Sequence, residues 1–215
     1  MMMERDEDFR ERRRRMVEDQ IVRRGVRDER VLEAMRRVPR HPFVPEDLRD
    51  RAYEDHPLSI GEGQTISQPY VVAFMTEQLS LKGHERVLEI GSGCGYQTAV
   101  LAAMCARVYA IEYFASLASR ASVTLESLGI DNVTLRKGDG NHGWPEEAPF
   151  DAVLVAAAAP ALPPALVDQM VEGGRMVLPL GDCRQSLTLV EKTTSGIRTT
   201  DVLGVRFVPL LGGRG

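Results

Sequence analysis

The sequence predicts an α/β fold with a doubly wound, mostly parallel, seven-stranded sheet and a helical extension at the N-terminus. From Arg86 onward, short β-branched or aliphatic segments alternate with longer amphipathic or small-residue segments, a pattern typical of βα units. Residues 1–55 differ, because they are rich in charge and their apolar residues recur at helical spacing. The length of 215 residues suits one such domain with a helical appendage.

The composition is that of a globular protein and disfavours several classes. Hydrophobic residues make up 43% of the chain, and 27 Lys and Arg against 31 Asp and Glu leave a net charge of −4. Proteins that bind a nucleic-acid backbone usually carry a strongly basic domain, which this balance does not provide. No segment reaches the roughly 18 apolar residues needed to cross a bilayer, and the polar N-terminus has no signal-peptide core. We therefore expect a cytoplasmic protein that binds neither nucleic acid nor membranes.

Cysteine and histidine show no metal-site or disulfide pattern. The three cysteines include no C-x-x-C pair, and the four histidines are scattered without the spacing of zinc ligands. An odd number of unpatterned cysteines also argues against a disulfide framework. We therefore expect a reduced protein without a bound metal.

Two helices are expected in the N-terminal segment. Apolar residues fall at helical spacing on both sides of Gly25, Asp28 is the expected N-cap of the second helix, and Pro39 ends it. The arginine run 12–15 is interpreted as a solvated helix face rather than a nucleic-acid contact, because acidic residues flank it. No role is assigned to residues 1–12.

The connection from Pro39 to Pro69 is irregular and rich in proline and glycine. A connection of this length without periodicity is more often functional than idle. Proline is favoured in the first turn of a helix, so we expect a helix to begin at Gln68 or Pro69 and to run through Leu79.

The rest of the sheet follows from the alternation of segments. The expected strands are 86–90, 107–111, 133–136, 151–156, 175–179, 186–192 and 202–208. The expected helices are 95–105, 114–128 and 163–172. Gly129 and Gly173–Gly174 stand where helix C-terminal caps belong.

A glycine-rich turn follows the first strand of this sheet. Its sequence, Gly91-Ser92-Gly93-Cys94-Gly95, has the spacing G-x-G-x-G rather than the G-x-G-x-x-G that seats a pyrophosphate. Glu89 precedes the turn, where a carboxylate repels an anionic ligand and favours a cationic one. S-adenosylmethionine, which carries a sulfonium and an ammonium group, therefore fits better than NAD.

Two further acidic residues follow the next two strands. Glu112 stands where a carboxylate can accept both ribose hydroxyls, and Asp139 stands where it can accept from an adenine amino group. Ligands of open α/β sheets bind at the carboxyl ends of the strands, so these residues belong to one edge. The candidate cofactor-binding residues are Glu89, Gly91, Ser92, Gly93, Gly95, Glu112, Asp139 and Gly140.

Longer motifs around these residues resemble a known family. The segment 87–102, VLEIGSGCGYQTAVLA, is similar to the class I S-adenosylmethionine-dependent methyltransferases, which have a Rossmann-like fold. The segment 57–70, PLSIGEGQTISQPY, is more discriminating. Together with MVEDQIVRRGVRDERVL, VPRHPFVP and VRFVPLLGG, it resembles the protein-L-isoaspartate (D-aspartate) O-methyltransferases, from about Met16 to Gly213.

The resemblance implies a repair methyltransferase. Such an enzyme moves the methyl group of S-adenosylmethionine to the free α-carboxylate of L-isoaspartyl, and also D-aspartyl, residues in damaged proteins and peptides, and leaves S-adenosylhomocysteine. It implies Ser67 as the active-site residue and Gln64, Thr65, Ile66 and Ser67 as substrate contacts, with no metal. It further implies a monomer in which residues 1–80 form the helical extension and substrate loop and residues 81–215 the cofactor domain of one compact unit.

The local chemistry of Ser67 agrees with a positioning role. The residue stands at or beside the start of the expected helix, where unpaired backbone N–H groups and the helix dipole favour an anion. No histidine forms a recognisable dyad with it, and direct transfer needs no covalent intermediate. The alternative is that Ser67 is only a helix cap. The loop 57–67 is the natural candidate for a lid.

Four residues depart from the pattern of the resembled family. They are Glu62, Phe74, Cys94 and Ala156, and the resemblance places an arginine at position 74. The segment 155–160, VAAAAP, disfavours two other functions. It lacks the polar acceptor and aromatic ring of base-methylating enzymes and the acidic metal ligands of catechol-type enzymes. A cofactor-binding protein without catalysis and an NAD-binding module remain alternatives.

Overall fold

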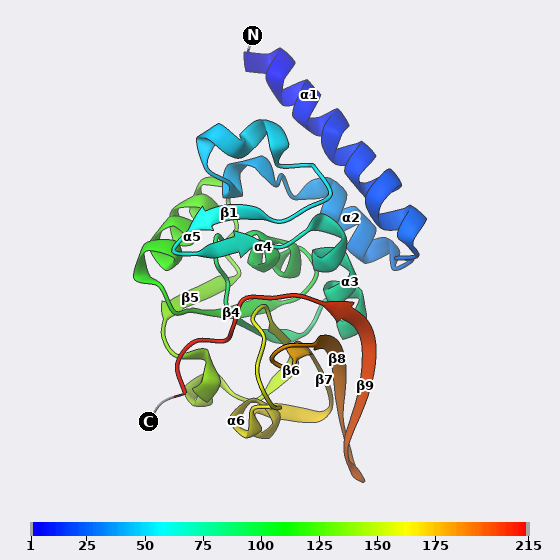
Figure 1. Ribbon diagram of the computed structural model, residues 1–215, viewed down its shortest axis with the longest axis vertical. Coiled ribbons are helices and arrows are strands. Elements are labelled where there is room, and N and C mark those ends of the chain that lie inside the picture. The colour runs from blue at the N-terminus through cyan, green and yellow to red at the C-terminus, as the bar shows by residue number, and fades with distance from the viewer. Residues whose placement is uncertain (1, 214–215) are drawn as a thin grey trace.

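The computed structural model describes residues 2–213, with side chains from Glu7 onward. Its centre is a seven-stranded sheet with the strand order β5-β4-β3-β6-β7-β8-β9 (Figure 1). The neighbouring strands β5, β4, β3, β6 and β7 are parallel to one another. Strand β8 is antiparallel to both of its neighbours, β7 and β9. The strands are β3 (Arg86–Ile90), β4 (Arg107–Glu112), β5 (Val133–Lys137), β6 (Phe150–Val155), β7 (Met170–Leu180), β8 (Gln185–Thr193) and β9 (Gly196–Val205). The predicted fold class is confirmed.

Helices cover both faces of this sheet. Alternate side chains of each buried strand point to opposite faces, so Val87 joins a core beneath α3, α4 and α5, while Leu88 joins a second core with Leu166 of α6. The helices are α1 (Met2–Arg15), α2 (Glu29–Arg37), α3 (Pro69–Leu79), α4 (Tyr96–Ala102), α5 (Ala115–Ser127) and α6 (Pro164–Asp168). Short 3₁₀ turns span Val22–Arg24, His41–Phe43, Glu46–Arg51, Gly140–His142 and Pro145–Glu147.

The N-terminal segment packs on the α3–α4 side of the sheet. Helix α1 continues into a π-helical segment, Met16–Ile21, and Gly25 ends this stretch in a left-handed conformation. Phe9 of α1 is buried and stacks on His41 with ring centroids 4.1 Å apart. The Asp28 carboxylate accepts from the Arg30 backbone N–H at 2.9 Å, which confirms the predicted N-cap of α2.

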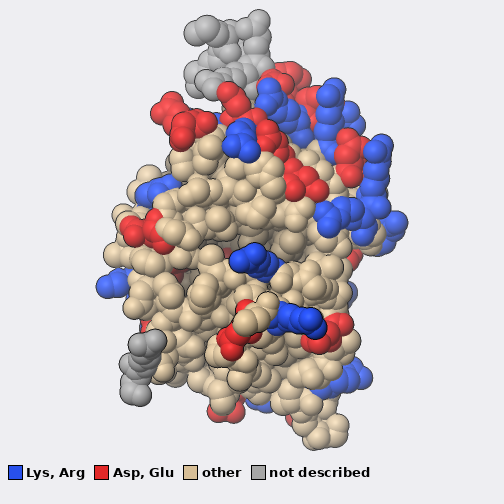
Figure 2. Space-filling view, viewed as in Figure 1, with Lys and Arg blue, Asp and Glu red and all other residues tan. Residues whose placement is uncertain are grey.

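Arg12, Arg14 and Arg15 of the arginine run on α1 lie on a solvated helix face, as predicted, whereas Arg13 is half-buried and donates to the Arg36 carbonyl at 2.6 Å. Arg14 and Arg15 both pair with Glu11 at 2.8 Å, and Arg12 pairs with Asp8 at the same distance. Figure 2 shows the same mixture, with Asp and Glu interspersed among Lys and Arg at the top of the view. Within residues 2–213, no helix is both long enough and apolar enough to cross a membrane.

The boundary between α6 and β7 differs from the prediction. The expected helix 163–172 ends at Asp168, and the two glycines expected as its cap lie inside β7. Between two pairs of partners, Phe150 with Met170 and Ala152 with Arg175, β7 advances five residues while β6 advances two. An added Cβ at Gly174 would lie 2.9 Å from the Val171 carbonyl oxygen. Glycine therefore allows a close backbone approach in this bulge.

Strand β9 also lies earlier than the expected 202–208. It begins at Gly196 and most of it is exposed at the edge of the sheet, so its first half carries no apolar pattern. After Val205 the chain leaves the sheet and crosses towards β6, where the Ala158 N–H donates to the Val208 carbonyl at 2.8 Å. The apolar residues 207–211 thus belong to a crossing segment (Figure 1).

The bulge in β7 gives a stability prediction. We expect Gly174→Ala to lower the free energy of unfolding by about 1–3 kcal/mol, because the added methyl group meets backbone oxygens of Val171 and Asp151 that cannot move freely. Urea unfolding measures this. Gly204→Ala on β9 is the control, because its Cβ meets nothing within 4 Å, and its change should stay within about 0.5 kcal/mol. Equal losses in both variants would contradict the proposed cause.

Candidate active site

Two adjoining hollows lie at the carboxyl ends of the parallel strands. The inner cavity is lined by the glycine turn after β3, the ends of β4 and β5, and the segments 64–67 and 208–211. The outer groove is lined by the segments 182–185 and 203–208 and by residues around the start of α3. Four residues line both hollows: Thr65, Ser67, Ala156 and Val208. Two ligands bound in these hollows would therefore meet beside Ser67.

Left-handed backbone angles explain the glycines of the turn. Gly91, Gly93 and Gly95 have φ values of 82°, 55° and 92°. An added Cβ at Gly95 would lie 3.1 Å from Ala121, so this glycine also permits α4 to approach α5. Gly91, Ser92 and Gly93 line the inner cavity, whereas Gly95 does not and shapes the turn.

Glu112 ends β4 and lines the inner cavity. Its Oε2 accepts from the Gly93 N–H at 2.7 Å and its Oε1 accepts from the Phe114 N–H at 2.9 Å. The side chain is nearly buried, so two backbone donors hold the carboxylate in place. A carboxylate fixed in this way keeps lone pairs on both oxygens for hydroxyl donors from a ligand.

Asp139 follows β5, but its side chain is used mainly within the protein. Its carboxylate accepts from the Asn141 N–H at 2.9 Å and from the Gly213 N–H at 2.8 Å. Burial would raise the pKa of Asp139, but these hydrogen bonds outweigh it and hold the pKa below its ordinary value. Its neighbours Gly138 and Gly140 line the inner cavity, and Asp139 itself does not.

Position 140 requires glycine for a steric reason. An added Cβ there would lie 2.2 Å from Ile90 Cγ2, so any other residue would push into the end of β3. Ile90 is itself a lining residue of the inner cavity. The glycine therefore keeps the floor of this cavity open.

Glu89 lies behind the glycine turn rather than in the inner cavity. Its side chain is fully buried, and neither carboxylate oxygen has a hydrogen-bond partner among the described residues. Burial raises the pKa of Glu89 to about 8, the nearby Thr98 hydroxyl opposes this, and the charge of Glu112 adds to it. With the protein's own groups alone, Glu89 is therefore largely protonated at neutral pH, and it attracts a cation less than its place in the sequence suggests.

The segment before Ser67 folds as a β-hairpin. Strands β1 (Leu58–Gly61) and β2 (Gln64–Ile66) pair antiparallel, and residues 61–63 turn with positive φ. Two residues of α5, which the sequence analysis missed, hold this hairpin. Arg120 Nη1 donates to the Ile60 carbonyl at 2.9 Å, and the Ser116 hydroxyl donates to Glu62 Oε1 at 2.6 Å.

The four residues that depart from the family pattern lie in different places relative to the two hollows. Glu62 is exposed at the hairpin tip and lines neither hollow, so its carboxylate does not oppose an anion at Ser67. Phe74 also lines neither hollow and packs on Tyr70 with ring centroids 5.7 Å apart. Cys94 and Ala156, in contrast, line the inner cavity.

Ser67 lies one residue before the N-cap of α3. The N-cap is Gln68, which makes no side-chain capping bond, and its amide donates instead to the Asp55 carbonyl and carboxylate. The Ser67 hydroxyl has no hydrogen bond within the described residues that would make it a cap, while its carbonyl accepts from Arg40 at 2.7 Å. The hydroxyl and the start of α3 are therefore free to bind a ligand.

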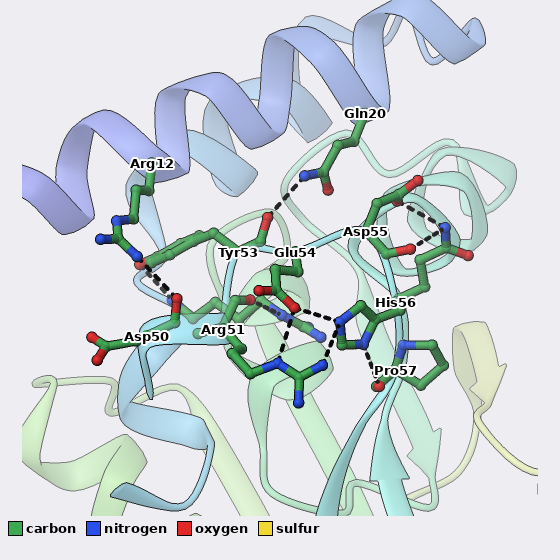
Figure 3. A network of polar contacts seen from close by, with 12 residues as sticks. Arg12, Gln20, Asp50, Arg51, Tyr53, Glu54, Asp55, His56 and Pro57 are labelled. Carbon is green, nitrogen blue, oxygen red and sulfur yellow. Dashed lines mark hydrogen bonds and ion pairs between the residues drawn. The ribbon is translucent and has the colours of Figure 1, made fainter. Parts of the chain in front are cut away.

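A polar network holds the segment that leads into the hairpin (Figure 3). The Glu54 carboxylate contacts Arg51 Nε at 3.1 Å and His56 Nε2 at 2.6 Å, and His56 Nδ1 contacts the Pro57 carbonyl at 2.8 Å. The Pro57 carbonyl and then the Glu54 carboxylate raise the pKa of His56, since both accept hydrogen bonds from the N–H groups of its protonated ring. Among the described residues, no group of three His, Cys, Asp or Glu side chains could hold a metal ion.

The buried carboxyl group gives a pH-dependent prediction. Unfolded Glu89 releases its proton near its ordinary pKa of 4.5, but the folded protein keeps it up to a pKa of about 8, so Glu89 destabilises the fold increasingly between these values. We expect Glu89→Gln to raise Tm by about 5 °C or more at pH 8, with a much smaller gain at pH 5. Thermal unfolding at both pH values checks this. Glu172→Gln, at an exposed position, is the control and should leave Tm unchanged at both pH values. A gain in Tm in Glu89→Gln that is the same at both pH values would contradict the proposed titration of Glu89.

Comparisons with known proteins agree with this geometry. The family model described as protein-L-isoaspartate(D-aspartate) O-methyltransferase (PCMT) matches residues 11–215. Protein-L-isoaspartate O-methyltransferase 1 of Syntrophobacter fumaroxidans is 57% identical over 205 residues, which cover 95% of this chain and 96% of that protein. The protein-L-isoaspartate O-methyltransferase of Opitutus terrae is 54% identical over 199 residues, covering 92% of this chain and 85% of that protein.

Solved structures show the same fold. A protein-L-isoaspartate O-methyltransferase superposes with a TM-score of 0.85 and 31% identity, covering 96% of this chain and 67% of that chain. A Plasmodium falciparum structure described as a protein-L-isoaspartate O-methyltransferase, in complex with S-adenosyl-L-homocysteine, has a TM-score of 0.81 and 30% identity, covering 92% of this chain and 97% of that chain. This chain belongs to the protein-L-isoaspartate(D-aspartate) O-methyltransferase family.

Proposed function

We propose that this protein transfers the methyl group of S-adenosylmethionine to the free α-carboxylate of isoaspartyl residues, and of D-aspartyl residues, in proteins and peptides. The observation that carries the proposal is the junction of the two hollows. Ser67 and Thr65 line both, so a cofactor in the inner cavity and a peptide in the outer groove meet at the hydroxyl of Ser67. Membership of the family supports the same reaction.

The inner cavity fits the cofactor. The glycine turn leaves backbone without side chains at Gly91 and Gly93, and Gly140 keeps the floor open against Ile90. When bound, S-adenosylmethionine supplies a methyl group on a sulfonium. We assign the turn residues to the cofactor and the fixed Glu112 carboxylate to its ribose hydroxyls. We also assign Asp139, which stands between the lining residues Gly138 and Gly140, to the adenine amino group, through a lone pair that its bonds to Asn141 and Gly213 leave free. Glu89 lies behind the turn, where a bound cation would favour its ionised form.

Ser67 acts in this proposal by positioning. Its hydroxyl donates a hydrogen bond to one oxygen of the substrate carboxylate, and the unpaired N–H groups at the start of α3 favour the same anion. Gln64, Thr65 and Ile66 of the hairpin form the wall beside it. No general base is needed, because a carboxyl group with an ordinary pKa of about 4 is already ionised. The residues contribute orientation and the exclusion of water.

The base-methylating and catechol-type alternatives are disfavoured by the segment after β6. Its alanines, Ala157, Ala158 and Ala159, are buried and offer neither a polar side chain nor an aromatic ring to a base. Metal-dependent methylation would require a cluster of acidic ligands there, and the sequence 155–160 contains none. A cofactor-binding protein without catalysis would bind S-adenosylmethionine but would show no methyl turnover, so measuring turnover distinguishes it from the proposed enzyme.

The organisation of the chain is part of the proposal. We assign residues 1–80 to substrate binding and residues 81–215 to the cofactor, in one compact unit, because one hydrophobic core contains residues of both. We further propose a cytoplasmic monomer without a nucleic-acid partner. Three cysteines without disulfides support a reducing compartment, and the near-balanced charge disfavours a nucleic-acid backbone.

The first test uses methyl-labelled S-adenosylmethionine and two peptides that differ only in one aspartyl or isoaspartyl linkage. We expect base-labile label on the isoaspartyl peptide alone. Ser67→Ala should lower kcat/KM about 10- to 100-fold, because it removes one hydrogen bond to a charged group. Ser59→Ala, at an exposed position of the same hairpin, should leave kcat/KM within about twofold. Cofactor binding without transfer to either peptide would overturn the proposal.

The second test concerns the hairpin as a lid over both ligands. Arg120→Ala removes the donor that holds the Ile60 carbonyl, so we expect faster protease cleavage within 57–67 and a fall in kcat/KM of about tenfold or more. S-adenosylhomocysteine with peptide should slow this cleavage in the unmodified protein. Arg107→Ala is the control, because the side chain of this exposed arginine contacts Thr134 and Tyr109 and lines neither hollow. Cleavage that ligands do not change would contradict a lid.

A further inference from the structure

Arg40 is a fully buried arginine that contacts the active-site backbone. Its Nη2 donates to the Ser67 carbonyl at 2.7 Å and its Nε donates to the Ala52 carbonyl at 2.8 Å. Its guanidinium also lies over the ring of Tyr96, 4.8 Å from the ring centroid. One side chain thus joins the N-terminal segment, the residue before α3 and the first residue of α4.

This buried cation has no counter-ion. No carboxylate pairs with Arg40 among residues 7–213, and its Nη1 has no hydrogen-bond partner there. The polar groups that face it are Tyr53, Tyr96 and Cys94. Burial raises the pKa of the Tyr53 and Tyr96 hydroxyls and raises that of the Cys94 thiol to about 11, so none of the three groups neutralises the guanidinium at physiological pH.

A buried charge without a partner is costly. Burial lowers the pKa of Arg40, but an arginine side chain starts so far above neutral pH that it keeps its charge. Replacing such a group by an apolar one is often stabilising, unless the charge serves something other than the fold. Arg40 itself lines neither hollow, so an anion bound beside it would compensate the charge through its electrostatic potential rather than by direct contact.

The adjoining hollows show where such an anion can bind. Cys94 and Tyr96, which face the guanidinium, line the inner cavity, and Ser67, whose carbonyl it holds, lines both hollows. In the proposed function the substrate carboxylate sits at the Ser67 hydroxyl, within the same residue that Arg40 binds. The cofactor brings a carboxylate on its methionyl part as well as a sulfonium, so the test below measures the affinity for the cofactor as well as that for the substrate.

We propose that Arg40 is a positioning residue that sets the backbone of Ser67 and provides the positive potential that selects a carboxylate on the substrate. This inference rests on the proposed function. Arg40 then has two effects that a purely structural arginine would not combine. It places the Ser67 hydroxyl rigidly, and it discriminates between a charged and a neutral group in the substrate.

The test compares two peptides that differ only at the reacting group. One carries isoaspartate, with its free α-carboxylate, and the other carries isoasparagine, whose α-carboxamide is neutral. Their dissociation constants are measured with S-adenosylhomocysteine present. We expect the unmodified protein to bind the carboxylate at least about tenfold more tightly. In Arg40→Gln this preference should fall to about twofold or less, and in Arg40→Lys it should persist while kcat falls, because one ammonium cannot hold two carbonyls in a fixed fork.

Arg30→Gln is the matched control. Arg30 also donates to two backbone carbonyls, of Lys82 at 2.7 Å and of Met104 at 3.0 Å, but unlike the Ser67 bonded by Arg40, neither of these residues lines a hollow. We expect this variant to lower Tm and to keep the carboxylate preference. If Arg40→Gln weakens both peptides equally, the role of Arg40 is structural and the inference is overturned.

Two other outcomes distinguish a failure of this inference from a failure of the proposed function. A loss of S-adenosylhomocysteine affinity larger than the loss of peptide affinity would assign the charge to the cofactor and overturn the inference, with the methyl transfer intact. Absence of methylation by the unmodified protein would overturn the proposed function itself. If Arg40→Gln does not fold, Arg40→Lys provides the test. Loss of the preference for the carboxylate peptide in this variant, which keeps the positive charge, would also contradict the proposal.

Discussion

The carboxyl ends of β3 and β4 are tied together by hydrogen bonds that the inner cavity depends on. The Gly91 N–H donates to the Ile111 carbonyl at 2.8 Å, and the Gly93 N–H donates to the Glu112 carboxylate at 2.7 Å. These bonds require the left-handed backbone that glycine adopts without strain. They also place a carboxylate and an open stretch of backbone side by side. In our proposal the cofactor site is therefore a property of two adjacent parallel strands and the glycine turn that follows β3.

The substrate side is held by a different kind of interaction. The irregular segment from Pro39 to Pro69 lacks the long ladders of a sheet, so many of its carbonyl groups need other donors. Arginine side chains from distant elements supply them: Arg120 of α5 at Ile60, and Arg40 at Ala52 and Ser67. Such contacts place Ser67 accurately while leaving its hydroxyl and the start of α3 available.

Two buried ionisable groups without partners have a common interpretation. Glu89, behind the glycine turn, and Arg40, beside Ser67, are both fully buried and both lack a partner of opposite charge in the described structure, where Arg40 is charged and Glu89 is largely protonated. A methyl transfer from a sulfonium to a carboxylate brings together a cation and an anion. In our proposals the bound cation favours the ionised form of Glu89, and the bound anion compensates the charge of Arg40. In our proposals the fold therefore carries a cost in stability at both positions that the bound ligands offset.

The sequence by itself determined the features that depend on local physics. The glycine turn, the Asp28 cap and the start of α3 at Pro69 follow from backbone preferences of a few residues, and the buried strands follow from their apolar runs. Only the tertiary structure decided the end of α6, the early start of β9 and the outward direction of Glu62, because each depends on a partner far along the chain. Arg40 belongs to the second group. In the sequence it is one arginine among many, and only packing shows that it is the buried, unpaired cation beneath Ser67.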